Sequence, residues 1–565
     1  MHGRRFTMIN GFATRPLLAV GVALALSGVP SAWAQVPSAG QVMRDIESLA
    51  AAPLPSAPVQ VDMPPPSAPS QATPGGGMQL QVKGFVIDGN QVFNREQLLE
   101  LLADLPGQSL DLAGLRAAAQ RITQYYQAHG YALARAFLPA QDIDQGIVRI
   151  QVLEGHYGRI ELNNCSRVID AVLQQPLSAL RPGEAVYDAD LEQSLLLLSD
   201  LPGVEVKGTL RPGSLPGSTD LVVDAEPGPW YAGTLEADNY GDRYTGEYRL
   251  GASLVLNNPL RLGDALNMRL LQSDQHQRYY RFGYSLPVGP WSTTLGTSYS
   301  RMSYQLGKDV EVLEAKGQAT VRSFFALQPL IRSRTFNLSA QLQFDDKQLQ
   351  DDIDLFDLRS PKHVELWTLG INASGQDRWL GGGQSFVSLS YSAGRLGIGE
   401  AIDRTMDRLS AGAAGHFTRA NLSLGRLQYL SPRWQLYSQL NAQWAGNNLD
   451  SSEKFGLGGP NGVRAYALGA GSGDQGWQAS TELRYLAAPG VQLSGFADRG
   501  VITVSKRPWT AQSNQRSLTA AGVSASWRRA GQQLSVTAAW PIHGTEQNDA
   551  PHQDPRVWFS AIQYF

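Results

Sequence analysis

The feature that most constrains this chain is the alternation of apolar and polar residues from Trp230 to its last residue. Short runs there place an apolar side chain at every second position. Because successive side chains of a β-strand point to opposite faces, such runs predict strands with one apolar and one polar face. In residues 434–444, tryptophans also close both ends of the run. Apolar outer faces with aromatic ends are typical of a transmembrane β-barrel, although a soluble β-sandwich would also alternate.

The lengths of the connections separate these two architectures. We count about 16 strands in residues 229–565, the even number expected of bacterial barrels. Connections after even-numbered strands are short, and those after odd-numbered strands are mostly longer. The short ones are residues 287–290, 431–432, 488–490 and 529–531, and the long ones are 345–360, 397–408, 447–476 and 505–516. Short turns on one side and long loops on the other favour a membrane β-barrel over a sandwich.

Composition narrows the class of protein further. A mean hydropathy of −0.23, with no mature run of about 18 apolar residues, excludes a helical membrane protein. The 58 glycines, 20 tyrosines and 12 tryptophans suit a β-rich chain with many turns and interfacial aromatic residues. The 47 basic and 50 acidic residues nearly balance, which argues against a nucleic-acid partner bound through bulk charge.

The N-terminal segment has the pattern of a secretory signal peptide. Basic residues precede the apolar run 16–26, and an Ala-Trp-Ala cleavage site ends at Ala34. The mature chain is therefore expected to begin at Gln35 in an oxidising compartment. Cys165 is the only cysteine, so neither a disulfide within the chain nor a cysteine metal site is expected. We expect Cys165 to be a small packing residue, with a reactive thiol as the alternative.

After the cleavage site, residues 38–51 read as a short amphipathic helix that Ser38 caps. Residues 53–77 are rich in Pro, Ser and Gly, which predicts an extended, mobile linker. The alternative to a helix on a linker is a disordered N-terminus of the mature chain.

Two similar modules follow, each in the order strand, helix, helix, strand, strand. The first is expected at residues 80–87, 95–102, 112–129, 132–137 and 147–153, and the second at 158–162, 168–174, 189–198, 204–210 and 220–225. The second helix of the first module has apolar residues at helical spacing. A generic substrate-binding domain would give the same pattern.

Two short runs in the barrel region stand out. One is the glycine-dense GLGGPNGVRAY, residues 456–466, and the other is FADRG, residues 496–500. In the second run Asp498 shares its strand face with Gln492 and Ser494, so it points into the lumen if the other face meets lipid. A carboxylate in that position needs a partner, and Arg464 in the glycine-rich run is the candidate. A plain surface loop is the alternative, and a phosphate loop is excluded because its lysine and following helix are missing.

These two runs resemble the VRGY-type loop signature and the F-x-D-x-G strand signature of the Omp85 superfamily. More narrowly, the chain resembles the transporters of two-partner secretion, of the haemolysin secretion/activation type. The resemblance implies functional roles for residues of both runs and for the last residue. They are Gly458, Gly459, Val463, Arg464, Tyr466, Phe496, Asp498 and Gly500 for the loop and its lumen anchor, and Phe565 as the assembly signal. Ala465 departs from the usual glycine, and Gln563 from the usual apolar residue third from the end.

The resemblance also implies the architecture and the activity. The two modules would be periplasmic POTRA-like domains that bind an unfolded client partly by strand addition, and the first helix would plug the lumen. The domains expected are a signal peptide (1–34), a plug helix (35–52), a Pro-rich linker (53–77), POTRA-like domains (78–155 and 156–228) and a barrel (229–565) with an inward loop (447–476).

The activity implied is export of a large unfolded exoprotein across the bacterial outer membrane without ATP. Such clients are adhesins, haemolysins or contact-dependent toxins with an N-terminal secretion domain. Outer-membrane lipid and the outer-membrane assembly machinery are the other partners implied, and no cofactor or metal is expected. An assembly factor of the same superfamily is the alternative, followed by a barrel enzyme or a porin. No serine-nucleophile elbow or HExxH motif is present in the sequence, so no enzymatic activity is expected.

Overall fold

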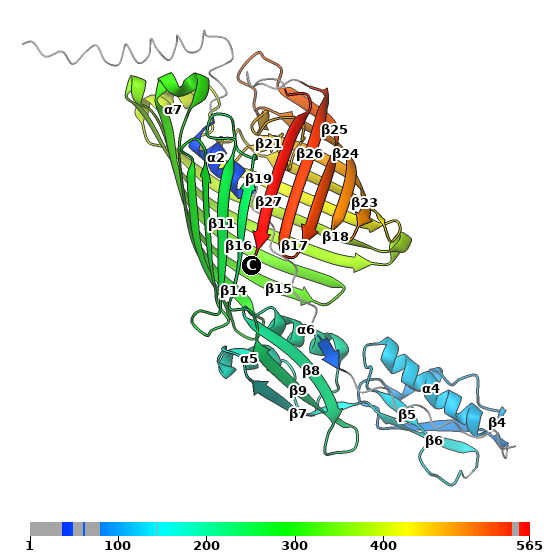
Figure 1. Ribbon diagram of the computed structural model, residues 1–565. Helices are drawn as coiled ribbons and strands as arrows, with labels where there is room; N and C mark the ends of the chain where they lie inside the picture. The colour runs from blue at the N-terminus through cyan, green and yellow to red at the C-terminus, as the bar shows by residue number, and fades with distance from the viewer. Residues whose placement is uncertain (1–36, 49–59, 63–78, 144, 545–552) are drawn as a thin grey trace, which may run out of the picture.

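The computed structural model describes residues 37–48, 60–62, 79–143, 145–544 and 553–565 (Figure 1). The expected signal peptide lies outside these residues, as does most of the Pro-rich linker. Among the described residues, no helix is both long and apolar enough to cross a bilayer.

Sixteen antiparallel strands close into one barrel in chain order, and the last strand pairs with the first. This confirms the barrel predicted from the alternation. The strands are β10 (Tyr231–Asp238), β11 (Arg249–Asn257), β12 (Ala265–Ser273), β13 (Arg278–Val288), β14 (Thr293–Gln305), β15 (Ala315–Arg332), β16 (Phe336–Ile353), β17 (Leu358–Asp377), β18 (Gly383–Ile398), β19 (Gly415–Tyr429), β20 (Trp434–Ala445), β23 (Gln475–Ala488), β24 (Val491–Thr503), β25 (Gln515–Arg529), β26 (Gln532–His543) and β27 (Arg556–Tyr564).

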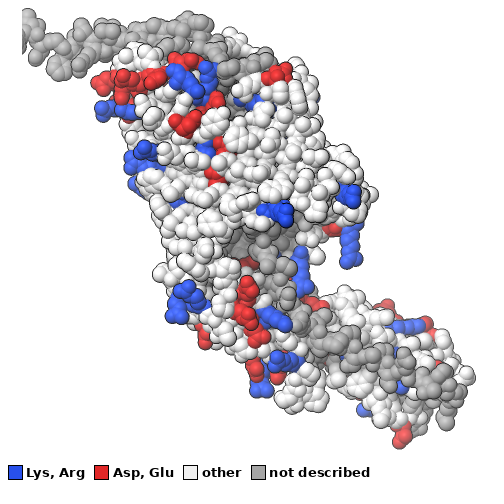
Figure 2. All heavy atoms as spheres, viewed as in Figure 1, with Lys and Arg blue, Asp and Glu red and all other residues white. Residues whose placement is uncertain are grey.

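The outer surface of the barrel is apolar, as the alternation predicts. Leu534 and Val536 of β26 are 48% and 53% exposed, and Trp434 and Trp444 lie exposed at the two ends of β20. In Figure 2 the wall over β23 to β27 is almost free of charged side chains, which gather instead towards the end that carries α7 (Ala401–Leu409). An uncharged outer band is the surface that a strand barrel presents to lipid.

The prediction of a long loop at residues 345–360 is wrong. β16 and β17 run through it and leave only residues 354–357 to join them, three of which form a short 3-10 turn, η3 (Asp354–Phe356). Asp345 of this segment is buried on the strand face towards the lumen. Asp351, on the same face, accepts hydrogen bonds from the Tyr304 hydroxyl and the Ala39 amide, both at 2.8 Å. Charges that line a polar lumen look the same in a sequence as charges in an outer loop.

The first α/β module comprises β2 (Leu80–Gln81), β3 (Gly84–Asp88), α3 (Arg95–Glu100), β4 (Ser109–Leu110), α4 (Leu112–Ala128), β5 (Arg135–Phe137) and β6 (Ile147–Leu153). Its main sheet has the order β3-β6-β5, with β3 and β6 parallel. The strand expected at residues 80–87 is split in two, because β2 pairs with β4 and β3 pairs with β6. The apolar face of α4 packs on this sheet in a core of its own.

The second module comprises β7 (His156–Asn164), α5 (Asp170–Leu177), α6 (Asp188–Ser199), β8 (Val204–Pro212) and β9 (Ser218–Pro227). Its strands follow the order β8-β9-β7 and cover a second core. Cys165 is exposed, so the expectation that it is a small packing residue is wrong. It follows the last residue of β7, where the chain leaves the sheet.

The sequence predicted an extended, mobile linker, but part of this linker is held by the second module. Its residues Gln60–Asp62 form a short strand, β1, that pairs in parallel with β8 of the second module. The register places Gln60 opposite Lys207 and Asp62 opposite Thr209. The outer edge of that sheet is therefore already covered in part by the chain's own N-terminal region.

The second module is fixed against the short turns of the barrel. Arg332, at the end of β15, donates to both carboxylate oxygens of Asp200 at 2.7 and 2.8 Å. The Arg334 amide donates to Glu192 of α6 at 3.0 Å. These contacts place the second module on the side of the short turns, and Figure 1 shows the first module on that side as well. The long loops lie at the opposite end of the barrel.

The predicted N-terminal helix, α2 (Ala39–Ser48), lies inside the barrel (Figure 1). Ser38 caps it as expected, since its hydroxyl accepts a hydrogen bond from the Gln41 amide at 3.3 Å. Val42, Met43 and Ile46 are buried, in one cluster with inward-facing residues of the wall such as Met302. The helix therefore fills part of the lumen by packing and is not a strand partner of the wall.

Candidate functional site in the barrel lumen

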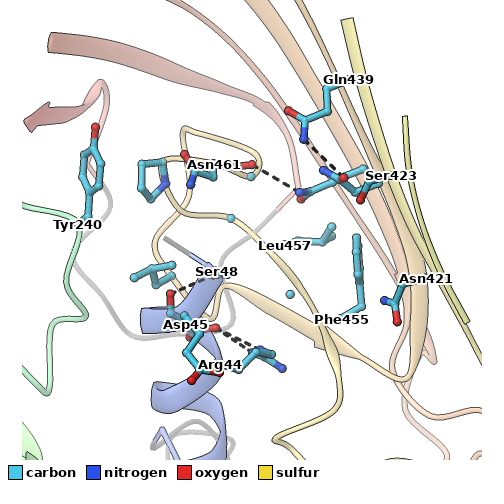
Figure 3. A pocket seen from close by; sticks show the side chains of 18 of the residues that line it. Arg44, Asp45, Ser48, Tyr240, Asn421, Ser423, Gln439, Phe455, Leu457 and Asn461 are labelled. Atoms are coloured by element: carbon cyan, nitrogen blue, oxygen red, sulfur yellow. Dashed lines mark hydrogen bonds and ion pairs between the residues drawn. The ribbon is translucent and has the colours of Figure 1, made fainter. Parts of the chain in front are cut away.

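The chain between β20 and β23 folds back into the barrel instead of extending outwards. We call residues 446–474 the lumen loop; it contains a small hairpin of β21 (Phe455–Leu457) and β22 (Gly471–Gly473). Together with α2 and the wall it lines a cavity of about 1310 Å³. In Figure 3, Arg44 and Asp45 of α2, Phe455 and Asn461 of the loop and Asn421 of the wall lie around this cavity.

Glycines shape the turn at the tip of the lumen loop. Gly458 and Gly459 have φ of +81° and +84°, in the left-handed region that favours glycine. A Cβ on Gly458 would lie 2.4 Å from the carbonyl oxygen of Ala467. The Gly459 amide donates to the Tyr466 carbonyl at 2.8 Å, which closes the turn and presents Arg464 to the wall.

Arg464 and Asp498 meet in a two-point ion pair, as the strand parity predicted. The guanidinium donates from Nε and Nη2 to the two Asp498 oxygens at 2.9 and 2.8 Å, and the Arg464 amide adds a bond of 3.1 Å. The Asp498 side chain is 1% exposed and that of Arg464 12%. A planar guanidinium matches a carboxylate in this geometry, which a lysine ammonium cannot copy.

Three further residues hold the guanidinium. The Phe496 ring lies under it, with 3.3 Å between Cζ and the ring centroid. Arg464 also donates to the Ser480 hydroxyl at 2.9 Å and lies 3.3 Å from Glu482. Ser480 in turn donates to Asp498 at 2.7 Å.

Sequence reasoning missed Ser480 and Glu482. They lie on β23 directly opposite Asp498 and Phe496. The register between the two strands shifts between Leu486 and Ala488, so counting straight back from Ala488 opposite Val491 would give Thr481 in place of Ser480.

The remaining predicted loop residues form an apolar contact around the ion pair. Val463 and Tyr466 are 0% and 1% exposed, and the Tyr466 hydroxyl donates to the His543 carbonyl at 2.9 Å. Gly500 leaves room for the loop, since a Cβ there would lie 2.5 Å from Leu457 and 3.3 Å from Val463. Ala465 has no positive φ, so the backbone at this position does not demand the glycine that the superfamily pattern has.

Phe565, the expected assembly signal, lies at the opposite end of the barrel from the loop. Its amide and carbonyl pair with Gly233 of β10 at 3.1 and 2.9 Å, so the chain end helps to close the barrel. The Phe565 side chain is 54% exposed. It is therefore accessible beside the seam between β10 and β27.

Comparison with known proteins matches this architecture over most of the chain. Residues 217–529 match the family described as haemolysin secretion/activation protein ShlB/FhaC/HecB, and residues 80–155 match the ShlB-type POTRA domain. The heme/hemopexin transporter protein HuxB of Haemophilus influenzae is 29% identical over 84% of this chain and 85% of its own length. The outer membrane transporter CdiB of Dickeya dadantii is 26% identical over 74% of this chain and 75% of its own.

Solved structures show the same fold. CdiB from Escherichia coli superposes with a TM-score of 0.71 at 21% identity, covering 99% of this chain and 100% of that one. BamA from Haemophilus ducreyi lacking POTRA domains 1–3 gives a TM-score of 0.51 at 13% identity, over 86% of this chain and 100% of that one.

Proposed function

This chain belongs to the haemolysin secretion/activation family of outer-membrane transporters, and we propose that it exports one large exoprotein through its barrel lumen. The protein lies in the outer membrane with its POTRA-like modules in the periplasm. The exoprotein enters unfolded from the periplasmic side and leaves at the side of the long loops.

The observation that carries this proposal is the way in which the lumen is filled. The wall is a complete ring of strand pairs, and α2 occupies the lumen through side-chain packing and a few hydrogen bonds. The lumen loop lines the rest of the cavity. Because α2 is not part of the strand ring, it can leave the lumen without breaking any strand pair of the wall. A closed resting state and an open transporting state are thus compatible with one intact barrel.

The names of the relatives support a proposal for the class of cargo. Their names include a heme/hemopexin transporter and the hemolysin transporter protein HpmB of Proteus mirabilis. We expect the cargo here to be an adhesin, a haemolysin or a contact-dependent toxin with an N-terminal secretion domain. The periplasm holds no ATP, so binding to the modules and folding outside the cell supply the driving force.

The test is to express the transporter with a candidate exoprotein, sought among the products of the neighbouring genes, and to follow that exoprotein in intact cells. Export predicts that protease added outside digests the exoprotein when the transporter is present. Without the transporter, the exoprotein should stay protected in the periplasm. If instead the levels of unrelated outer-membrane barrels fall when the transporter is deleted, the protein is an assembly factor. If neither measurement changes, both functions are excluded.

A further inference from the structure

The lumen loop is held to the wall at a second place, which precedes Arg464 in the same loop. Two buried carboxylates in its first arm, residues 449–454, meet basic side chains of the wall. Asp450 lies 2.7 Å from the Lys362 ammonium of β17, and Glu453 lies 2.6 Å from the Lys347 ammonium of β16. Glu453 also lies 3.0 Å from the Arg419 guanidinium of β19.

These carboxylates are deeply buried. The side chains of Asp450 and Glu453 are 6% and 1% exposed. A buried carboxylate that loses its cation is left with an uncompensated charge, so each contact constrains where the arm can lie. Three strands, β16, β17 and β19, thus fix one short arm of the loop, whereas the Arg464 anchor uses β23 and β24.

The same arm is also the surface on which α2 packs. Arg44 of the helix donates to the carbonyl oxygens of Ser451 and Lys454 at 3.0 and 2.6 Å. The Ser38 and Ser451 hydroxyls lie 2.7 Å apart. Gly40 packs so closely on Ser452 that a Cβ would lie 2.6 Å from the Ser452 Cβ. The arm therefore has wall cations on one side and the helix on the other.

We propose that Asp450 and Glu453 are positioning residues: they fix the arm on which α2 packs, and so keep the helix in the lumen. The contacts divide the lumen loop into two parts with separate anchors, the tip and the first arm. The Arg464 anchor sets the position of the tip, and the Asp450 and Glu453 anchor sets the occupancy of the lumen by α2. The role of the Asp450 and Glu453 anchor rests on the proposed transport function in one respect, namely that α2 closes the path of the exoprotein through the lumen.

The test uses a disulfide as a reporter of helix position. Cys165 is replaced by serine, and Ser38→Cys with Ser451→Cys places two thiols where hydroxyls lie 2.7 Å apart. With the anchor intact, mild oxidation should cross-link nearly all of the protein. Adding Asp450→Asn and Glu453→Gln should lower the cross-linked fraction several-fold and raise ion conductance in planar bilayers. Heat-modifiable gel mobility shows whether the barrel is folded in each variant.

Two controls separate this anchor from general damage. Arg464→Ala should leave the cross-linked fraction unchanged, since within the described residues no hydrogen bond or ion pair joins Arg464 to α2. Glu365→Gln changes an exposed carboxylate on the opposite face of β17 and should also have no effect. Full cross-linking in the Asp450→Asn, Glu453→Gln variant would overturn the proposal, as would an equal loss in Arg464→Ala. These outcomes do not depend on export, so they are distinct from a failure of the proposed function.

Discussion

At the scale of single residues, Arg464 is the point where the lumen loop and the barrel wall depend on each other. Its guanidinium contacts Asp498, Ser480, Glu482 and the Phe496 ring at once. Parity along one strand was enough to place Asp498 in the lumen, and Arg464 was its candidate partner because a buried carboxylate needs one. The neighbours on β23 needed the register between two strands, which the parity of one strand does not contain.

We therefore expect Arg464→Ala and Asp498→Ala each to impair export while the barrel still assembles. Leaving one charge of a buried pair alone costs about 3–5 kcal/mol, which is enough to displace the loop tip. Arg464→Lys should restore export only in part. The measurement is a double-mutant cycle on export rate, with heat-modifiable mobility as the folding control. If the two alanine losses simply add, the residues are uncoupled and the anchor is wrong.

Gly500 gives a second residue-scale prediction. A methyl group there would clash with Leu457 and Val463 of the docked loop, and overpacking of this kind costs about 1–3 kcal/mol. Gly500→Ala should therefore reduce export. Gly495→Ala on the same strand is the matched control, because a Cβ there has nothing within 4 Å. Equal export by both variants would show that the close approach at Gly500 is irrelevant.

At the scale of elements, the helices and strands with a single amphipathic face were predictable. The β6 strand has the predicted bounds, and α4 ends one residue before its predicted end. β1 was not predictable, because its three residues in a Pro-rich stretch gain a partner only from the distant edge of β8. The extent of β16 and β17 was missed for a related reason, since strands of 18 and 20 residues continue past the roughly 9–11 residues that span a bilayer.

The N-terminal helix should act as a detachable plug. Deleting residues 36–51 removes the side chains of α2 from the lumen and should raise ion conductance in planar bilayers. Much of the export should remain, because the wall and the lumen loop are untouched. An unchanged conductance would remove the plug role, whatever happens to export.

The periplasmic modules should hold the recognition surface for the exoprotein. A purified fragment of residues 79–227 contains both module cores and should bind the N-terminal domain of the exoprotein, but not its distal repeats. A longer fragment that begins at residue 53 includes β1 and should bind more weakly if the client uses the edge of β8. Binding by the full-length protein but not by the short fragment would place recognition elsewhere.

At the scale of the whole molecule, strand alternation and loop asymmetry were sufficient to predict the barrel and its even strand number. The second module lies beside the short turns, where Arg332 and Asp200 join it to the barrel. The resemblance implied a plug helix and an inward loop, but alternation alone could not provide the partners of the charged residues that face the lumen. Asp351 and Glu453 are charged residues that resemble solvated loop residues until the barrel closes around them and supplies their partners.

The central claim, that the exoprotein passes through the lumen, is tested by photo-crosslinking to an arrested client. A photoreactive residue is placed at Gln439, which lines the lumen cavity, or at Leu440, its outward-facing neighbour on β20. An exoprotein stalled during export by a folded C-terminal fusion should cross-link to position 439 and not to position 440. Cross-linking at position 440 with none at position 439 would contradict passage through the barrel.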